Sequence, residues 1–204
     1  MNGTLPWYVA RSGGLVTYVL LTVSVIFGTA VAARAFRNKP GLPWMNGMHE
    51  WLGTLTLGFL GVHVVGLLLD TYIGFSIVEV LVPFTSHYRP GVVAWGIVAF
   101  YLLLVVQLSA RFRGKLPRKW RPLWKRAHMM AYPLFIVSTV HLLTVGTDAR
   151  TLPVLLLVAA AIAATVAAAA RSRWLRDQRA LARTPAAAPA PQQDLAVRRH
   201  ELVG

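Results

Sequence analysis

The chain contains no cysteine and is poor in acidic residues. Only seven of its 204 residues are Asp or Glu, and all charged residues together make up 14% of the sequence. Without cysteine the protein can form no disulfide, no thiolate metal site and no thiol redox centre. Any redox chemistry of this chain therefore requires a bound cofactor.

Apolar residues dominate the remainder of the sequence. They make up 56% of it, and the mean hydropathy is +0.54. Five apolar stretches approach or reach the length that crosses roughly 30 Å of bilayer hydrocarbon; they cover residues 14–33, 48–69, 91–109, 128–147 and 151–170. We therefore predict an all-α integral membrane protein, a bundle of five transmembrane helices. A further apolar stretch, 73–84, is too short to span and is expected to lie along the membrane surface or to dip into it.

The basic residues, which give a net charge of +14, are unevenly distributed. Three lie between the first two apolar stretches, eight between the third and fourth, and seven after the fifth, while Arg11, Arg89 and Arg150 occupy the other segments. Because basic residues favour the cytoplasmic side of a membrane, we predict a multi-pass protein of the cell membrane with its N-terminus outside and its C-terminus in the cytoplasm. The charge indicates topology and membrane lipid rather than nucleic acid; attraction of an acidic electron-donor protein is a weaker inference from it.

This pattern predicts three regions along the chain. Residues 1–13 form an outer N-terminal segment, and residues 14–170 form the membrane domain. Residues 171–204 are basic and then rich in Ala and Pro, which predicts a disordered cytoplasmic tail. We assign no role to His200, which lies in this tail.

Four histidines lie within two of the apolar stretches. His49 and His63 delimit "HEWLGTLTLGFLGVH", and His128 and His141 delimit "HMMAYPLFIVSTVH". The two stretches are the second and the fourth, so they cross the membrane in the same direction. Their histidine separations correspond to rises of about 21 Å and about 19.5 Å along a helix. We therefore expect His49 and His128 to share the cytoplasmic level, and His63 and His141 the outer level.

Two facing imidazoles supply the two axial ligands of a haem iron. Two such pairs, one at each level, would hold two haems between the second and fourth helices. A structural zinc site is a poorer interpretation, because the levels lie roughly 20 Å apart and each offers two histidines where zinc takes four ligands. Isolated polar residues or a proton relay are the simpler alternatives, but four costly intramembrane ionisable groups at matching depths favour a functional site.

Helical phase sets a condition on this interpretation. At about 100° per residue, a spacing of 14 returns within about 40° of the same face, whereas a spacing of 13 misses it by about 140°. The segment between His128 and His141 therefore has to be distorted. Pro133 lies within it and removes a helical N–H, which bends or rewinds a helix.

Other residues near each level could support a cofactor. Gly14 and Gly28 are 14 residues apart in the first stretch, and glycines let a backbone approach the face of a porphyrin closely, although glycine also serves ordinary helix packing. Haem propionates need cations or hydrogen-bond donors. The candidates are Arg11 and Arg89 at the outer level and Trp124 and Arg126 at the inner level.

The chain resembles a known family. The two histidine spacings resemble those of the ferric reductase-like transmembrane domain, found in NADPH oxidases, ferric reductases and the haem subunit of the bacterial methionine sulfoxide reductase system. The segments "LVPFTSHYRP", "WRPLWKRAHMMAYPLF" and "VHLLTVGTD" also match, and the resemblance covers roughly residues 10–170. It points to a small bacterial single-domain member.

The resemblance implies a function and a ligand set. It implies two b-type haems, one held by His49 and His128 and one by His63 and His141, with electrons passing from the cytoplasmic face to an acceptor at the outer face. The sequence has no G-x-G-x-x-G and no room after residue 170 for flavin or nicotinamide domains. The expected donor is therefore a separate flavoprotein, a quinol or a small carrier, and the chain is an oxidoreductase or the electron-transfer membrane subunit of one.

Two other functions stay open at the sequence level. A di-haem cytochrome b of a quinol-linked redox complex also uses paired histidines on parallel helices, and it would need a quinone pocket and partner subunits. A membrane protein without redox activity could use the histidines as a proton relay. Internal repeats and broken-helix pairs, which are typical of transporters, are not evident in the sequence.

Overall fold

The computed structural model describes residues 5–33, 42–145 and 151–181. Seven α-helices and two short 3-10 helices occupy these ranges, and the described residues contain no strand. The long helices are α1 (Leu5–Ala32), α2 (Leu42–Leu69), α4 (Pro90–Phe112) and α7 (Leu152–Leu181), while α5 (Arg121–Met129) and α6 (Ala131–Val145) together form one further crossing. Five segments of the described chain are long and apolar enough to span a membrane, which confirms the predicted number.

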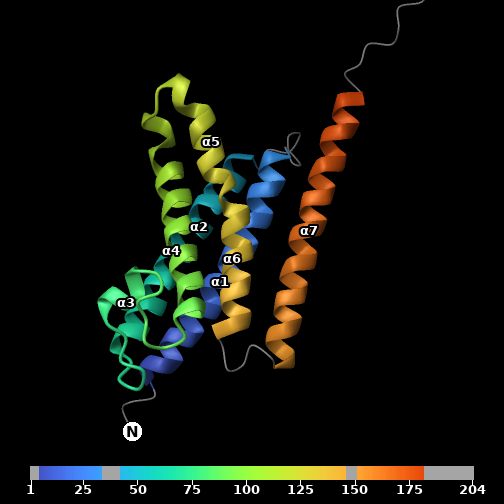
Figure 1. The fold of residues 1–204 in the computed structure, drawn as a ribbon. Coiled ribbons are helices and arrows are strands. Elements are labelled where there is room, and N and C mark those ends of the chain that lie inside the picture. Colours follow the sequence, from blue (N-terminus) through green and yellow to red (C-terminus); the bar gives the residue numbers. More distant parts are fainter. Residues whose placement is uncertain (1–4, 34–41, 146–150, 182–204) are drawn as a thin grey trace, which may run out of the picture.

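The helices run alternately up and down in one bundle (Figure 1). The short helix α3 (Ile77–Leu81) lies at one end, which we call the α3 end. The connection between α4 and α5, with η1 (Arg113–Lys115) and η2 (Arg118–Trp120), lies at the other, which we call the hairpin end. Helices α2 and α5–α6 both run from the hairpin end to the α3 end, so they are parallel, as the sequence predicts.

Several helices extend beyond the predicted stretches, α1 and α7 by the most. Helix α1 begins at Leu5 rather than near residue 14, so most of the predicted N-terminal segment is helical. Pro6 is tolerated because the first turn of a helix needs no N–H from it, and the Arg11 guanidinium packs 4.7 Å from the centre of the Trp7 ring.

Helix α7 extends to Leu181 rather than ending near residue 170. Residues 171–181, predicted as the start of a disordered tail, are therefore helical. Ala, Leu and Arg, which are frequent there, are strong helix formers. The remainder of the predicted tail, 182–204 with His200, lies outside the described residues.

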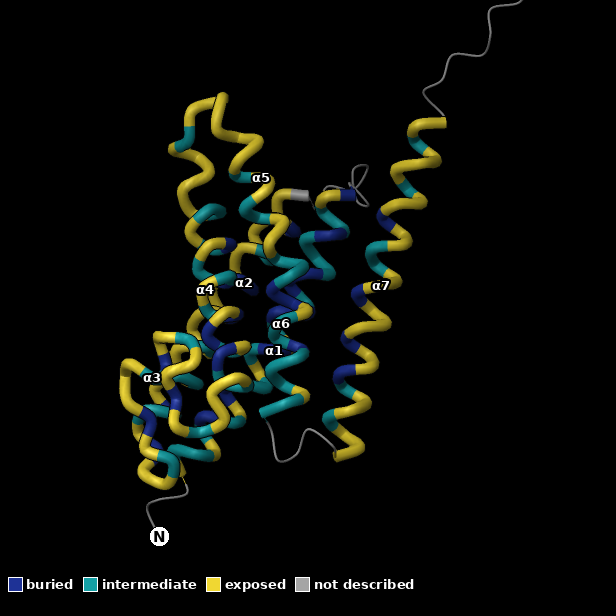
Figure 2. Tube along the Cα trace, viewed as in Figure 1, coloured by how far each residue is buried: buried dark blue, intermediate teal, exposed yellow. Residues whose placement is uncertain are grey.

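The core of the bundle lies where α1, α4, α6 and α7 meet. Its buried side chains form one cluster: Tyr18, Leu21, Val25, Ala99, Leu103, Leu134, Phe135, Val158 and Ala161. Figure 2 shows the buried residues concentrated inside the bundle, whereas the outward side of α7 and the hairpin end are exposed. Threonine hydroxyls bond back to carbonyls of their own helices, as Thr22 does to Tyr18 at 2.8 Å, which satisfies polar groups inside an apolar bundle.

The segment between α2 and α4 is ordered by polar contacts around Glu79. Ser76 and Glu79 form a capping box at the start of α3, and the Tyr101 hydroxyl donates to the Leu81 carbonyl at 2.8 Å. Helix α3 is thereby held beside α4. The expectation that this segment lies at or in the membrane surface stays a prediction.

Candidate functional site

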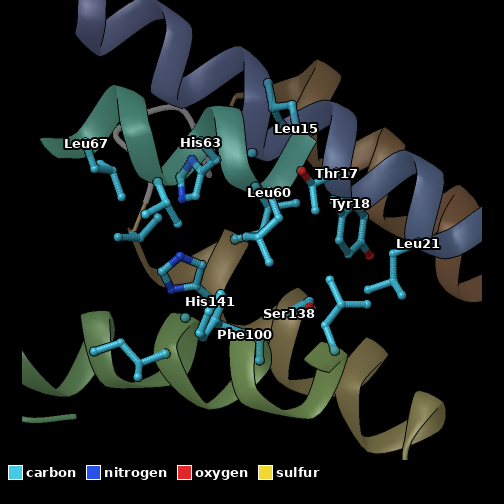
Figure 3. Close-up of a pocket in the computed structure, with 18 of the residues that line it drawn as sticks. Leu15, Thr17, Tyr18, Leu21, Leu60, His63, Leu67, Phe100, Ser138 and His141 are labelled. Carbon is cyan, nitrogen blue, oxygen red and sulfur yellow. The ribbon is translucent and has the colours of Figure 1, made fainter. Parts of the chain in front are cut away.

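The four intramembrane histidines form two pairs, one toward each end of the bundle. At the hairpin end, the rings of His49 on α2 and His128 on α5 lie 5.9 Å apart between centres, edge to face. At the α3 end, His63 on α2 and His141 on α6 point toward one another (Figure 3). The structure thus brings together the partners that the sequence predicts.

A cavity separates His63 from His141. Its volume is about 210 Å³, and both rings line it. The other lining residues are mostly apolar and come from α1, α2, α3, α4, α6 and α7, with Leu60 and Phe100 close to the rings in Figure 3. Protein interiors are otherwise closely packed, and a cavity of about 150 Å³ already binds a benzene molecule. The space between His63 and His141 is therefore large enough to mark a ligand site.

Three of the four rings are held by a hydrogen bond at Nδ1. His63 Nδ1 lies 2.6 Å from the Ala10 carbonyl and His141 Nδ1 lies 3.1 Å from the Val92 carbonyl. Since a carbonyl only accepts, these two Nδ1 atoms carry the proton, which leaves Nε2 of each ring unprotonated and able to bind a metal. His49 Nδ1 lies 3.2 Å from the Ser24 hydroxyl, which permits the same tautomer.

His128 differs from the other three. Its Nδ1 is buried and makes no hydrogen bond among the described residues; the Val106 carbonyl of α4 faces it without reaching hydrogen-bonding geometry. The ring instead stacks on Trp124, with 5.7 Å between the centres and 25° between the planes. Packing rather than a hydrogen bond therefore orients His128.

Glycines leave the space that the rings occupy. A Cβ added at Gly14 would lie 3.0 Å from His63 Nδ1, one at Gly28 would lie 2.9 Å from His49 Cε1, and one at Gly96 would lie 2.6 Å from His141 Cε1. Gly14 and Gly28 were predicted to let the backbone approach a porphyrin; in the structure the rings next to them are those of His63 and His49. The sequence does not predict the roles of Gly96 and Ser24; Gly96 lies in α4, which contains no histidine.

The helix between His128 and His141 is interrupted, as the phase argument requires. Helix α5 ends at Met129 and α6 begins at Ala131, and the N–H of Met130 bonds to the Ala127 carbonyl, three residues back, at 3.1 Å. A three-residue turn advances by about 120° per residue rather than about 100°, which reduces the phase difference between the two histidines. Pro133 lies in the next turn and offers no N–H to the Met129 carbonyl.

Of the four residues predicted to contact propionates, two lie at a histidine pair and two are exposed. Arg11 lines the cavity between His63 and His141, whereas Arg89 is exposed at the start of α4 and is not among the lining residues. Trp124 stacks on His128, and its buried Nε1 has no hydrogen-bond partner in the described part of the chain. Arg126 is exposed on α5. Arg11 and Trp124 are therefore the two candidates that lie at a histidine pair.

The described residues form no metal site with three or more protein ligands, because no three His, Asp or Glu side chains come together there. A zinc site, which needs three or four protein ligands, is therefore a poor fit to either pair. Two opposed imidazoles with free Nε2 atoms, one pair flanking a cavity, fit the axial ligands of haem.

Comparison with known proteins supplies an independent result. Residues 13–139 match the family described as ferric reductase like transmembrane component. The match includes His49, His63 and His128 and ends two residues before His141. No curated protein and no solved structure matches the chain.

The matched region covers more than half of the chain and contains three of the four paired histidines. With five candidate spans, the chain is a multi-pass integral membrane protein that belongs to the ferric reductase like transmembrane component family.

Proposed function

We propose that this protein carries electrons across the membrane through two b-type haems, each bound by two histidines. His49 and His128 would hold the haem near the cytoplasmic face, and His63 and His141 the haem near the outer face. Family membership suggests transmembrane electron transfer, and members commonly bind haem. The observation that carries the proposal is the pair His63 and His141 facing one another across a cavity, with both Nδ1 atoms occupied by carbonyls.

The hydrogen bonds prepare the histidines for this role. Metal-bound histidines usually donate their other ring N–H to a carbonyl or carboxylate, which fixes the tautomer and the ring orientation. Ala10 and Val92 act in this way on His63 and His141. Haem held by two imidazoles has no open coordination position, so it supplies outer-sphere electron transfer rather than substrate binding.

The rest of the chain provides insulation and charge. The cavity walls are mostly apolar, which excludes water around the site. Arg11 and the Trp124 N–H would serve the propionate groups of the outer and inner haem respectively. One electron enters from a donor on the cytoplasmic side, which is oxidised by one electron, and leaves to an acceptor on the outer side, which is reduced by one. We propose a separate flavoprotein, quinol or small carrier as the donor.

The proton-relay alternative is disfavoured by the same contacts. A relay needs ring nitrogens that exchange protons with donors and acceptors along a path. The Nδ1 atoms of His63 and His141 instead bond to main-chain carbonyls of the neighbouring helices α1 and α4, which cannot pass a proton on.

The test is an absorbance spectrum of the purified protein, oxidised and then reduced with dithionite, together with the haem-to-protein ratio. We expect close to two haems per chain, with spectra of six-coordinate haem in both states. His63→Ala and His128→Ala should each remove one haem, from opposite ends. His87→Ala is the matched control, since His87 lies in the loop before α4, and it should keep both. Absence of haem from the wild-type protein would refute the proposal.

A further inference from the structure

The two histidines of the α3 end each lie against one turn of a neighbouring helix, and the two turns have the same construction. At the α3 end, the Ala10 carbonyl of α1 holds His63 Nδ1, and Gly14, four residues later, leaves space for the ring. On α4, the Val92 carbonyl holds His141 Nδ1, and Gly96, four residues later, leaves space for that ring. Positions four apart lie on one face of a helix, so one turn supplies both the acceptor and the space.

The construction recurs 14 residues later in α1 with a different acceptor, and only in part in α4, where Ala110 stands in place of the glycine. In α1 the second turn contains Ser24 and Gly28, which contact His49. The acceptor there is the Ser24 hydroxyl rather than a carbonyl. In α4 the second turn contains Val106, whose carbonyl faces His128 without forming a hydrogen bond. The hairpin end therefore offers its histidines weaker acceptors than the α3 end does.

This difference bears on the electron density of a bound metal. A histidine that donates Nδ1–H to a strong acceptor becomes a more basic ligand, and a more basic ligand favours the oxidised metal. A hydroxyl, which is itself a donor, accepts less strongly than a backbone carbonyl does. His49 and His128 should therefore be weaker electron donors than His63 and His141.

Local charge also favours the reduced form of a metal bound at the hairpin end. The Arg113 guanidinium lies 5.4 Å from the centre of the Trp124 ring, which in turn stacks on His128. Six further Lys and Arg residues lie in the same connection between α4 and α6. The cavity at the α3 end is lined by one basic residue, Arg11. Positive charge stabilises the reduced form of a metal centre, since reduction lowers the positive charge of that centre.

We infer that Ser24 is a positioning residue that orients His49 and tunes the inner site, and that the inner haem has the higher midpoint potential. This inference rests on the proposed function. Its consequence is that an arriving electron resides first at the inner haem. Transfer to the outer haem is then the uphill step, and net transfer follows the potential difference between the donor and the outer acceptor.

The test is a redox titration of the purified holoprotein, followed by haem absorbance, for the wild type and Ser24→Ala. Loss of the hydroxyl removes the acceptor from His49 Nδ1 and should shift one midpoint potential upward. The component that moves should be the one with the higher potential. Ser24→Thr retains a hydroxyl and should restore the wild-type value. Thr22→Ala is the matched control, because Thr22 is a buried hydroxyl of α1 that bonds to the Tyr18 carbonyl, and it should move neither potential.

The outcomes separate this inference from the proposed function. Wild-type protein without haem refutes the proposed function. Two haems with unchanged potentials in Ser24→Ala refute the tuning role, and a shift confined to the lower-potential component refutes the predicted order. If Ser24→Ala loses the inner haem and Ser24→Thr keeps it, the positioning role is supported. Loss of that haem from both variants would contradict a role for the hydroxyl.

Discussion

The histidine rings and the residues that touch them decide what this molecule can hold. His63 and His141 each have one ring nitrogen bonded to a main-chain carbonyl and line one cavity. The sequence predicts these rings and their pairing, because histidine is rare in apolar spans and the spacings are regular. It does not predict the Ala10 and Val92 carbonyls, since every residue has a carbonyl and only the packing of two helices selects one.

The space at Gly96 gives a direct test at this scale. In Gly96→Ala the added Cβ would lie 2.6 Å from His141 Cε1 and 2.9 Å from its Nε2, which forces the ring away from its position. We expect the haem-to-protein ratio to fall by about half, with loss from the outer site. Gly91→Ala is the control in the same helix, because nothing lies within 4 Å of that position. Equal haem content in the two variants would contradict the proposed arrangement.

A buried hydroxyl pair lies between the two histidine levels. The Tyr18 hydroxyl lies 3.0 Å from the Thr139 hydroxyl, and Thr139 also donates to the Phe135 carbonyl at 2.8 Å. In Tyr18→Phe the Thr139 hydroxyl keeps this second partner, so the cost should be small, about 0.6 kcal/mol as for other interhelical hydrogen bonds in membranes. Thermal unfolding in detergent measures it, and a loss several times larger would show that the pair does more than join α1 to α6.

At the scale of elements, His87 links the loop before α4 to α3 and to the segment before α3. His87 Nδ1 lies 2.5 Å from Glu79 Oε1, and His87 Nε2 lies 3.1 Å from the Ile73 carbonyl. Both partners are acceptors, so only the imidazolium form satisfies both contacts. The hydrogen bond and charge of Glu79 raise the pKa of His87 above its usual value of 6.5, and the Ser76 and His87 N–H groups with the His87 ring lower the pKa of Glu79 to about 2.

This contact predicts a pH dependence of the loop. Because the His87 pKa is raised in the folded protein, its stabilisation is complete below 6.5 and is lost as the pH rises through the raised value. The Glu79 contribution is present above 4.5 and is lost as the pH falls toward about 2. The loop should therefore be most stable between about pH 4.5 and 6.5.

An NMR titration of the His87 ring tests this expectation. Its pKa should exceed 6.5, and Glu79→Gln should lower it, because the amide carries no charge. A His87 pKa at or below 6.5 in the wild-type protein would contradict the imidazolium assignment.

The role of Pro133 in the interruption between α5 and α6 can be tested by substitution. Pro133→Ala supplies the missing N–H to the Met129 carbonyl and favours a continuous helix. That change should turn His128 away from its position facing His49 and weaken the inner haem, while the outer haem stays bound. Retention of both haems, with unchanged spectra, would show that Met130 and the packing around it maintain the turn without the proline.

The sequence predicts the distortion but not its location. The phase difference of a 13-residue spacing requires an irregular turn somewhere in the segment, and Pro133 suggests a place. The structure puts it at Met130. The helix ends are predicted less well, because hydropathy marks the part of a helix inside the hydrocarbon. Leu5–Arg11 and Arg171–Leu181 extend beyond that part.

At the scale of the whole molecule, two parallel helices place two histidine pairs toward opposite ends of one bundle. The basic residues of the α4–α5 connection mark the hairpin end, which we propose to be cytoplasmic. A single chain thus presents one histidine pair toward each end of the bundle. The central claim is that an electron crosses the bilayer by way of both sites.

Proteoliposomes test this claim most directly. The holoprotein is reconstituted into vesicles that contain ferricyanide, and a reductant that does not cross the bilayer is added outside. We predict rapid bleaching of the trapped ferricyanide with the wild type and with His87→Ala, and bleaching no faster than in protein-free vesicles with His63→Ala or His128→Ala. Wild-type vesicles that retain two haems per chain but bleach no faster than empty vesicles, or a His63→Ala variant as fast as the wild type, would contradict the account.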